Sequence, residues 1–168
     1  EEKQRYRGQL IQSHRITVSY KDEIVKVMLP ILLPHRKGTY SDYIYKPLYL
    51  ALKDWCQLRL EQGESLPFYE KATICFQHMY DECLPKSRIR DHDNMEEKQV
   101  VDALGMFFLQ SDGGLFLNTY HVTLISNQDR TVLFLMPQEW FPSWLQKENR
   151  GTDISKKSAV VSAENSTG

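Results

Sequence analysis

The length, composition and charge of the chain limit the classes of protein to which it can belong. Its 168 residues, 41% of them hydrophobic, suffice for one domain with a substantial core. The formal net charge of −1 excludes a general electrostatic attraction to nucleic acid, so phosphate binding must come from a local patch or from bound cations. Three cysteines without CxxC spacing argue against a disulfide framework and a structural zinc site, and we expect a cytoplasmic protein.

The N-terminal part of the chain predicts a polar lead-in followed by an antiparallel hairpin. After the lead-in, residues 1–13, residues 14–20 alternate apolar and polar side chains with the period of a half-buried strand. A short turn leads to a second strand at residues 24–29, which ends at Pro30. The longest apolar run, residues 27–33, contains this proline and is far shorter than the roughly 20 residues that span a bilayer, so no membrane segment is predicted.

The next part of the chain predicts a helix and a third strand. Between residues 45 and 60, apolar side chains recur at three- and four-residue spacing, which is typical of an amphipathic helix with Pro47 in its first turn. Gly63 is expected to end this helix. Residues 68–80 again alternate and predict the third strand.

A second helix is predicted after residue 92. Asp93, with Glu96 three residues later, has the pattern of a capping box that begins a helix reaching about Leu109. The Ser-Asp-Gly-Gly stretch at residues 111–114 breaks this helix.

The last third of the chain completes the predicted fold. Residues 119–126 and 130–136 predict two strands joined as a second hairpin by the three residues between them. A short amphipathic helix is expected around residues 139–148, and residues 150–168 predict a disordered tail. The order of elements predicts a single α+β domain over residues 14–149, with helices packed on a mostly antiparallel or mixed sheet.

Three aspartates and one lysine near the second helix form a candidate metal-dependent active site. Asp91 and Asp93 lie two residues apart, and Asp112 follows the far end of the helix, so it joins them only if the chain folds back. Mg²⁺ keeps several waters, so two or three carboxylates beside a phosphate oxygen suffice to hold it. Lys98 would place a cation beside the phosphate. The alternative interpretation is structural, because such residues are usually a helix cap, a turn and a solvated helix face.

A basic stretch precedes these acids. Lys86, Arg88 and Arg90 alternate with Ser87 and Ile89, so in an extended segment all three cations point the same way. Such a row would bind the phosphates of a nucleic acid. The alternative is a basic loop that neutralises nearby acids.

Taken together, these motifs resemble the RusA family of Holliday-junction resolvases. In that family a basic stretch leads to Asp-x-Asp-Asn, followed by a Lys, an Asp-Ala-Leu and another Asp before a final hairpin. Here the pieces are Arg90-Asp91-His92-Asp93-Asn94, Lys98, Asp102-Ala103-Leu104 and Ser111-Asp112. The resemblance covers about residues 24–136.

The resemblance implies a RusA-like fold and an activity. By it, Asp91, Asp93 and Asp112 would bind Mg²⁺ and, with Lys98, form the catalytic site. Family members work as homodimers on branched DNA, in recombination and repair, and a setting in a phage or mobile element would fit. A carboxylate-bound metal activates water and stabilises charge on the phosphate, and a twofold dimer suits a four-way junction. The expected function is therefore that of a Mg²⁺-dependent, structure-selective DNA endonuclease.

Two other patterns leave a non-catalytic module open as the alternative. Four tyrosines, Tyr40, Tyr43, Tyr45 and Tyr49, follow Arg36-Lys37, and aromatic and basic residues together can stack bases and hold phosphate. The aromatic residues at positions 140–144 would suit docking to a protein partner or a second copy. For the tyrosines the structural interpretation is favoured, with Tyr45 and Tyr49 facing the core, whereas aromatic residues as dense as those at positions 140–144 equally often cap a core. The five histidines show no metal-ligand spacing.

Overall fold

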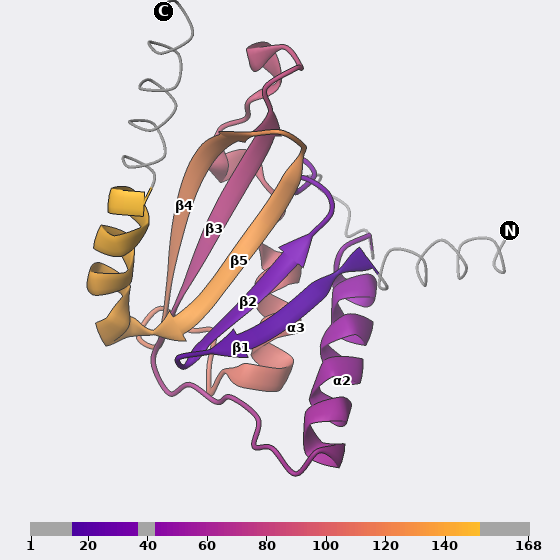
Figure 1. Ribbon diagram of the computed structural model, residues 1–168, viewed down its shortest axis with the longest axis vertical. Coiled ribbons are helices and arrows are strands. Elements are labelled where there is room, and N and C mark those ends of the chain that lie inside the picture. Colours follow the sequence, from indigo (N-terminus) through magenta and orange to yellow (C-terminus); the bar gives the residue numbers. More distant parts are fainter. Residues whose placement is uncertain (1–14, 37–42, 152–168) are drawn as a thin grey trace, which may run out of the picture. The chain divides into compact units, whose positions relative to one another are not determined.

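The computed structural model describes residues 15–36 and 43–151, which fall into two compact units divided after Pro137. The first unit holds a five-stranded mixed sheet, with α3 behind it and α2 beside β1 in the view of Figure 1. The predicted α+β class is therefore confirmed. The predicted lead-in and nearly all of the tail lie outside the described residues. Among the described helices, none has both the length and the apolar character needed to cross a membrane.

The elements have the following bounds. The strands are β1 (Thr17–Lys21), β2 (Ile24–Leu29), β3 (Ala72–Asp81), β4 (Leu117–Ser126) and β5 (Arg130–Pro137). The α-helices are α2 (Tyr45–Glu61) and α3 (Lys98–Phe108), and the short 3₁₀ helices are η1 (Lys86–Arg88), η2 (His92–Asn94) and η3 (Gln138–Trp140). The second unit begins with η3 and continues as a helix at residues 141–151, so the predicted C-terminal helix is present.

The first predicted hairpin is confirmed. β1 pairs antiparallel with β2, with Lys21 opposite Ile24. Asp22 and Glu23, the two residues between the strands, both have positive φ angles of 52° and 61°. Two positive φ angles in a two-residue loop are the requirement of a type I′ turn, whose twist matches that of the strands.

The second predicted hairpin is wrong. The sheet order is β1-β2-β5-β3-β4, so β3 lies between β4 and β5. β3 pairs parallel with β4 and antiparallel with β5. Almost every residue of β3 is buried, and its buried backbone N–H and C=O groups need hydrogen-bond partners, which β4 and β5 provide on its two edges. The short β4–β5 loop crosses the end of β3, where a carboxylate oxygen of Asp129 accepts a hydrogen bond from the backbone N–H of Asp81 at 2.9 Å.

The predicted start of the second helix is also wrong. α3 begins at Lys98, and Asp93 lies in η2. The backbone between them pairs instead with an earlier segment, because Arg36 N–H donates to the Asn94 carbonyl at 2.7 Å and Glu96 N–H donates to the Pro34 carbonyl at 3.0 Å. This bridge fixes η2 and the beginning of α3 next to the sheet.

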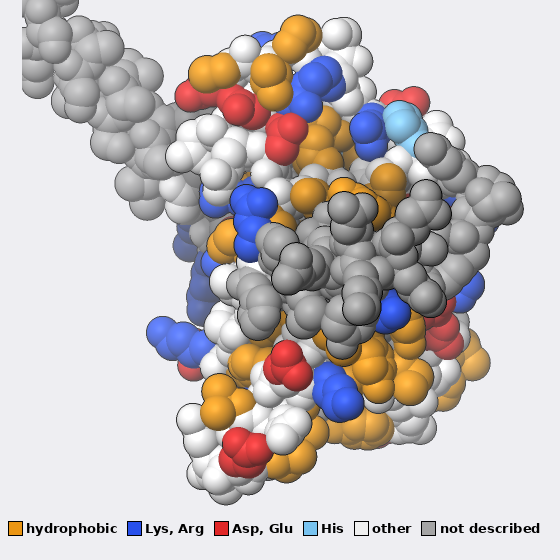
Figure 2. Space-filling model, turned by 90° about the vertical axis from the view of Figure 1, so that its right-hand side faces the viewer, with side chains coloured by type: hydrophobic (Ala, Val, Ile, Leu, Met, Phe, Trp, Pro, Cys, Tyr) orange, Lys and Arg blue, Asp and Glu red, His pale blue; other side chains and the backbone are white. Residues whose placement is uncertain are grey.

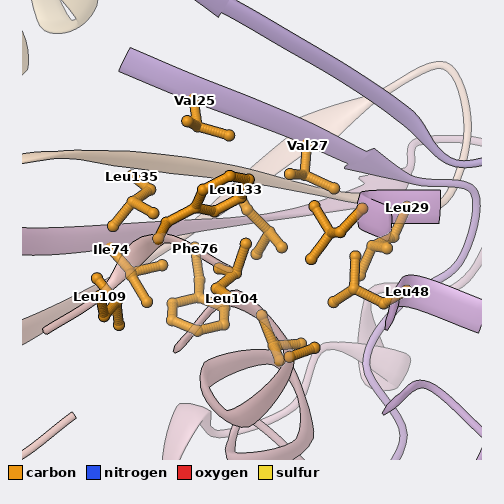
Figure 3. Close-up of a cluster of buried hydrophobic side chains, with 14 of the residues drawn as sticks. Val25, Val27, Leu29, Leu48, Ile74, Phe76, Leu104, Leu109, Leu133 and Leu135 are labelled. Carbon is orange, nitrogen blue, oxygen red and sulfur yellow. The ribbon is translucent and has the colours of Figure 1, made fainter. Parts of the chain in front are cut away.

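The core fills the space between the sheet and the two helices. Figure 3 shows side chains of β2, β3 and β5 converging with Leu48 of α2 and Leu104 of α3, both fully buried. The pairing of the strands places core residues next to one another across the sheet. Phe76 of β3, for example, lies opposite Leu133 in β5 and opposite His121 in β4. Burial of each such apolar side chain stabilises the fold by roughly 1.5–3 kcal/mol.

A buried glutamine joins the two helices. The side-chain oxygen of Gln99 in α3 accepts hydrogen bonds from the backbone N–H groups of Ile44 and Tyr45, at 3.2 and 3.0 Å. These groups lie at the start of α2, where helix N–H groups lack partners within the helix. Gln99 therefore sets the position of α2 against the first turns of α3.

Candidate functional site

A cavity of about 540 Å³ lies at the start of α3, between η2 and the edge strand β4. Its wall is strongly acidic. The charged residues that line it are Asp93, Glu96, Glu97, Asp102 and Asp112, with Arg36 and Lys98 as the cations. His92, Thr119 and His121 add polar side chains. An acidic, solvent-open cavity of this kind favours bound cations over bare anions.

Three of the four predicted catalytic residues line this cavity. Asp93 comes from η2, Lys98 from the first turn of α3, and Asp112 from the loop before β4, so the chain does fold back. Asp91 is exposed at the start of η2 and is not one of the lining residues. Within residues 15–36 and 43–151, no three His, Cys, Asp or Glu side chains are grouped so as to hold a metal ion directly. Metal binding by the three aspartates stays a prediction.

Lys98 pairs with an acid of its own helix. Its Nζ lies 2.8 Å from both carboxylate oxygens of Asp102, one turn further along α3. The Lys98 side chain is 73% exposed. Exposed pairs of this kind contribute little, between 0 and about 1 kcal/mol. The pair between Lys98 and Asp102 therefore adds little to the stability of the fold.

The predicted row of cations does not form as an extended segment. Lys86–Arg88 is a 3₁₀ turn, and Arg88 donates two hydrogen bonds to the carboxylate of Asp129, at 2.8 and 2.7 Å. This guanidinium holds the pKa of Asp129 below its usual range. Arg90 donates to the Leu33 carbonyl at 2.9 Å. Two of the three cations thus bind oxygens of the protein, and their role in nucleic-acid binding stays a prediction.

The predicted tyrosine cluster is partly packed. Tyr45 stacks on Tyr49 with ring centroids 6.0 Å apart, and Tyr49 contacts the ring of Phe107 at 5.2 Å. Tyr43 is about half exposed, and Tyr40 lies outside the described residues.

On the face shown in Figure 2, basic and acidic side chains are interspersed with apolar ones.

Three histidines that sequence reasoning missed lie side by side, and two of them, His92 and His121, line the cavity. His78 comes from β3, His92 from η2 and His121 from β4. Their ring centroids are 5.2 Å apart for His78 and either neighbour, and 5.4 Å apart for His92 and His121. The one local signal was His78 itself, a titratable residue on the otherwise apolar inward face of its strand.

A chain of hydrogen bonds runs from this cluster to the cavity wall. His78 Nε2 and His121 Nδ1 are 2.9 Å apart, and His121 Nε2 is 2.5 Å from Oε2 of Glu97. An ionised carboxylate only accepts hydrogen bonds, so His121 Nε2 carries a proton toward Glu97. His92 is tied separately, through Nε2, to the hydroxyl of Thr123 at 2.8 Å.

Burial and hydrogen bonding fix the charges of this chain. Burial, with the nearby imidazoles of His121 and His92 as a lesser cause, lowers the pKa of His78 to about 3, so its ring is neutral at neutral pH. Burial also lowers the pKa of His92. The hydrogen bond from His121 lowers the pKa of Glu97, against the opposing effect of burial. Glu97 is therefore ionised at neutral pH.

Comparison with known proteins gives the family of the chain. No curated protein matches it. A similar solved structure is that of a proposed translation initiation inhibitor from Salmonella typhimurium, with 10% sequence identity, a TM-score of 0.26, and coverage of 73% of this chain and 88% of that one. The family described as "Family of unknown function (DUF6100)" matches residues 1–158, and the chain belongs to it.

Proposed function

We propose that this protein is a Mg²⁺-dependent DNA endonuclease that acts on branched DNA, with its reaction centre in the cavity at the start of α3. One observation carries the proposal. Asp93, Lys98 and Asp112 come from three separate segments, and all three line the same cavity. These are residues that the RusA-like motif assigns to catalysis.

The donor atoms of the cavity fit Mg²⁺. This ion prefers oxygen ligands, keeps several waters, and is usually held by one or two carboxylates together with phosphate oxygens. Asp93 and Asp112 are exposed carboxylates on the cavity wall and would hold it. Asp91 enters the ligand set through the resemblance alone. When bound, the ion would lower the pKa of a water and stabilise the charge on the phosphate.

The side chains of the cavity would also position the DNA backbone. Lys98 and Arg36 provide the cations that a phosphodiester needs in an otherwise acidic site. A homodimer would present two such cavities to the two strands that are cut in a four-way junction. None of the three cysteines, all within the described residues, forms a disulfide, and Cys56 and Cys75 are buried, which agrees with the proposed setting in the reducing cytoplasm.

The test is cleavage of a labelled synthetic four-way junction by the purified protein, with Mg²⁺ and with EDTA. We expect paired nicks near the crossover with Mg²⁺ only, and little cleavage of a linear duplex of the same sequence. Asp93→Asn should abolish the nicks while leaving the fold and junction binding intact. The matched control is Asp54→Asn, an exposed aspartate on α2. If Asp93→Asn cuts as well as the parent, the assignment of the site is wrong.

A non-catalytic nucleic-acid- or protein-binding module is the second candidate. The observation that favours it is that, in the described part of the chain, no three potential ligands are grouped around one point. Junction binding without nicks, equal with Mg²⁺ and with EDTA, would establish this alternative.

A further inference from the structure

Glu97 differs from the other carboxylates of the cavity in how firmly it is oriented. Its Oε2 is held by the ring of His121 at 2.5 Å, and its side chain is 40% exposed on the cavity wall. Asp102, by contrast, pairs with the flexible and exposed side chain of Lys98, and Asp93 and Asp112 are exposed. A carboxylate fixed at one oxygen presents the other oxygen in a constant direction.

The ring that holds Glu97 is itself immobilised. His121 is 14% exposed and stacks on Phe76, with ring centroids 4.5 Å apart and planes 9° from parallel. On its other edge, Nδ1 is hydrogen-bonded to His78 at 2.9 Å. Rotation of the His121 ring would therefore break two hydrogen bonds and a stacking contact at once.

The buried His78 explains why the N–H of His121 is directed at Glu97. His78 is completely buried and neutral at neutral pH, and within the described residues its Nδ1 has no hydrogen-bond partner. An unpaired buried nitrogen is unfavourable, so a core that needed only to fill space would favour an apolar side chain here. What His78 provides is a partner for Nδ1 of His121, which leaves Nε2–H for the carboxylate. A base oriented by a second group in this way is a recurring arrangement in catalytic sites.

We propose that Glu97 is the general base of the cavity and that His121, held in turn by His78, is its positioning residue. This inference rests on the proposed endonuclease function. In the reaction, a water oxygen forms the new bond to phosphorus while its proton passes to the Glu97 carboxylate. The electron pair of the broken P–O bond goes to the leaving oxygen, which takes a proton from solvent. Glu97 then returns its proton to solvent.

The charges around Glu97 keep it in the ionised form that this role needs, and they also make it a weaker base than an ordinary glutamate. The hydrogen bond from His121 and the nearby Arg36 favour the ionised carboxylate, which is the form that accepts a proton. Burial acts in the opposite direction and keeps the group from being a still weaker base. The charged and titratable groups near it are His78 and His121 from the sheet, His92 from η2, the cations Arg36 and Lys98, and the acids Asp93, Glu96, Asp102 and Asp112.

The decisive variant is Glu97→Gln. Glutamine has the same shape and still accepts the His121 hydrogen bond through its carbonyl oxygen, but it does not take up a proton from water. We expect junction cleavage to fall by about 10² to 10⁴-fold, the usual contribution of a general base. Mg²⁺ affinity, measured by isothermal titration calorimetry, should stay at the parent value, whereas Asp93→Asn should weaken it.

Substitution of His121 separates positioning from mere packing. His121→Leu removes the hydrogen bond, so the pKa of Glu97 should rise, and the acid limb of the kcat/KM profile should move to higher pH. His121→Gln retains an N–H donor and should restore the profile toward that of the parent. The pKa of Glu97 can also be measured by ¹³C NMR titration of its carboxyl group in the absence of DNA. It should be highest in His121→Leu, and in His121→Gln it should lie closer to the parent value.

The outcomes distinguish this inference from the function on which it rests. If the parent protein makes no nicks, the endonuclease proposal fails and the role of Glu97 fails with it. If the parent cuts and Glu97→Gln cuts equally well, the cavity is an active site but Glu97 is not its base. A loss of Mg²⁺ affinity in Glu97→Gln as large as that in Asp93→Asn would make Glu97 a metal ligand and overturn the inference.

Discussion

Acidification should destabilise this protein in a pH range where carboxylates do not yet titrate, because His78 is buried in its neutral form. Its pKa is about 3 in the folded chain, against an ordinary value of 6.5. As the pH falls, the unfolded chain therefore binds a proton on His78 near pH 6.5, whereas the folded chain binds it only near pH 3. The stabilisation from neutral His78 is complete above pH 6.5 and is lost progressively as the pH falls toward 3.

The size of the effect follows from the two pKa values. One unit of pKa difference corresponds to about 1.4 kcal/mol. At pH 5 nearly all of the unfolded chain carries this proton, against about a quarter at pH 7, while the folded chain carries almost none at either pH. The free energy of unfolding should therefore fall by about 2 kcal/mol over these two pH units because of His78. His92, whose pKa is also lowered by burial, acts in the same direction.

The assay is urea unfolding followed by circular dichroism at pH 7, 6 and 5, with the parent and His78→Gln. Glutamine does not titrate and still provides an N–H group for His121, so the fall in unfolding free energy between pH 7 and pH 5 should be smaller in the variant by about 2 kcal/mol. Glu97 and Asp129 have lowered pKa values, so their effects arise at more acidic pH and do not mask the difference. Equal losses in the two proteins would refute the reasoning.

Two further predictions concern the packing of the helices. Gln99→Leu should lower the free energy of unfolding by about 1–3 kcal/mol, because the N–H groups at the start of α2 lose their buried acceptor. The control is Gln57→Leu on the exposed face of α2, which should change the free energy of unfolding by less than about 0.5 kcal/mol in the same urea titration. Leu104→Ala should cost about 2–5 kcal/mol through the cavity it leaves in the core, whereas Met106→Ala, two residues along the same helix but 66% exposed, should have little effect in thermal unfolding. Equal effects in either pair would contradict the packing described for that helix.

The elements that could be predicted from the sequence are those whose signal is local. The first hairpin and α2 were predicted closely, because the alternation of apolar residues reports which face of a strand or helix is buried. The same alternation does not report which strand is the neighbour. The pairing of β4 and β5 was therefore assigned to the nearest strand in sequence, whereas both strands pair with β3.

The start of α3 shows a second limit of local reasoning. Asp93 and Glu96 have the spacing of a capping box, yet the backbone between them bonds to Pro34 and Arg36. Capping stabilises a helix end by about 1 kcal/mol, and two backbone hydrogen bonds to a distant segment outweigh it. Hydrogen bonds to a segment about 60 residues earlier in the chain cannot be predicted from the residues around Asp93 alone.

The candidate site divides in the same way. Asp93, Lys98 and Asp112 could be grouped from the sequence because they belong to a motif that is compact in sequence; all three line one cavity, and their catalytic role stays a proposal. The chain from Glu97 through His121 to His78 was missed because its two hydrogen bonds join residues 24 and 43 positions apart. Histidines at such separations acquire a shared role only when β3 and β4 become neighbours.

The insertion of β3 between two strands that follow each other in the chain constrains the route of folding. β4 and β5 are joined by a short loop and would close most rapidly on each other, but such a hairpin leaves no place for β3 between them. The native sheet therefore depends on pairing between distant segments, which is slower than local closure. His78 and His121 meet only after this step, so the geometry around Glu97 is completed late. During refolding, the proposed DNA cleavage should return with the slow assembly of the sheet and not with the early gain of helix.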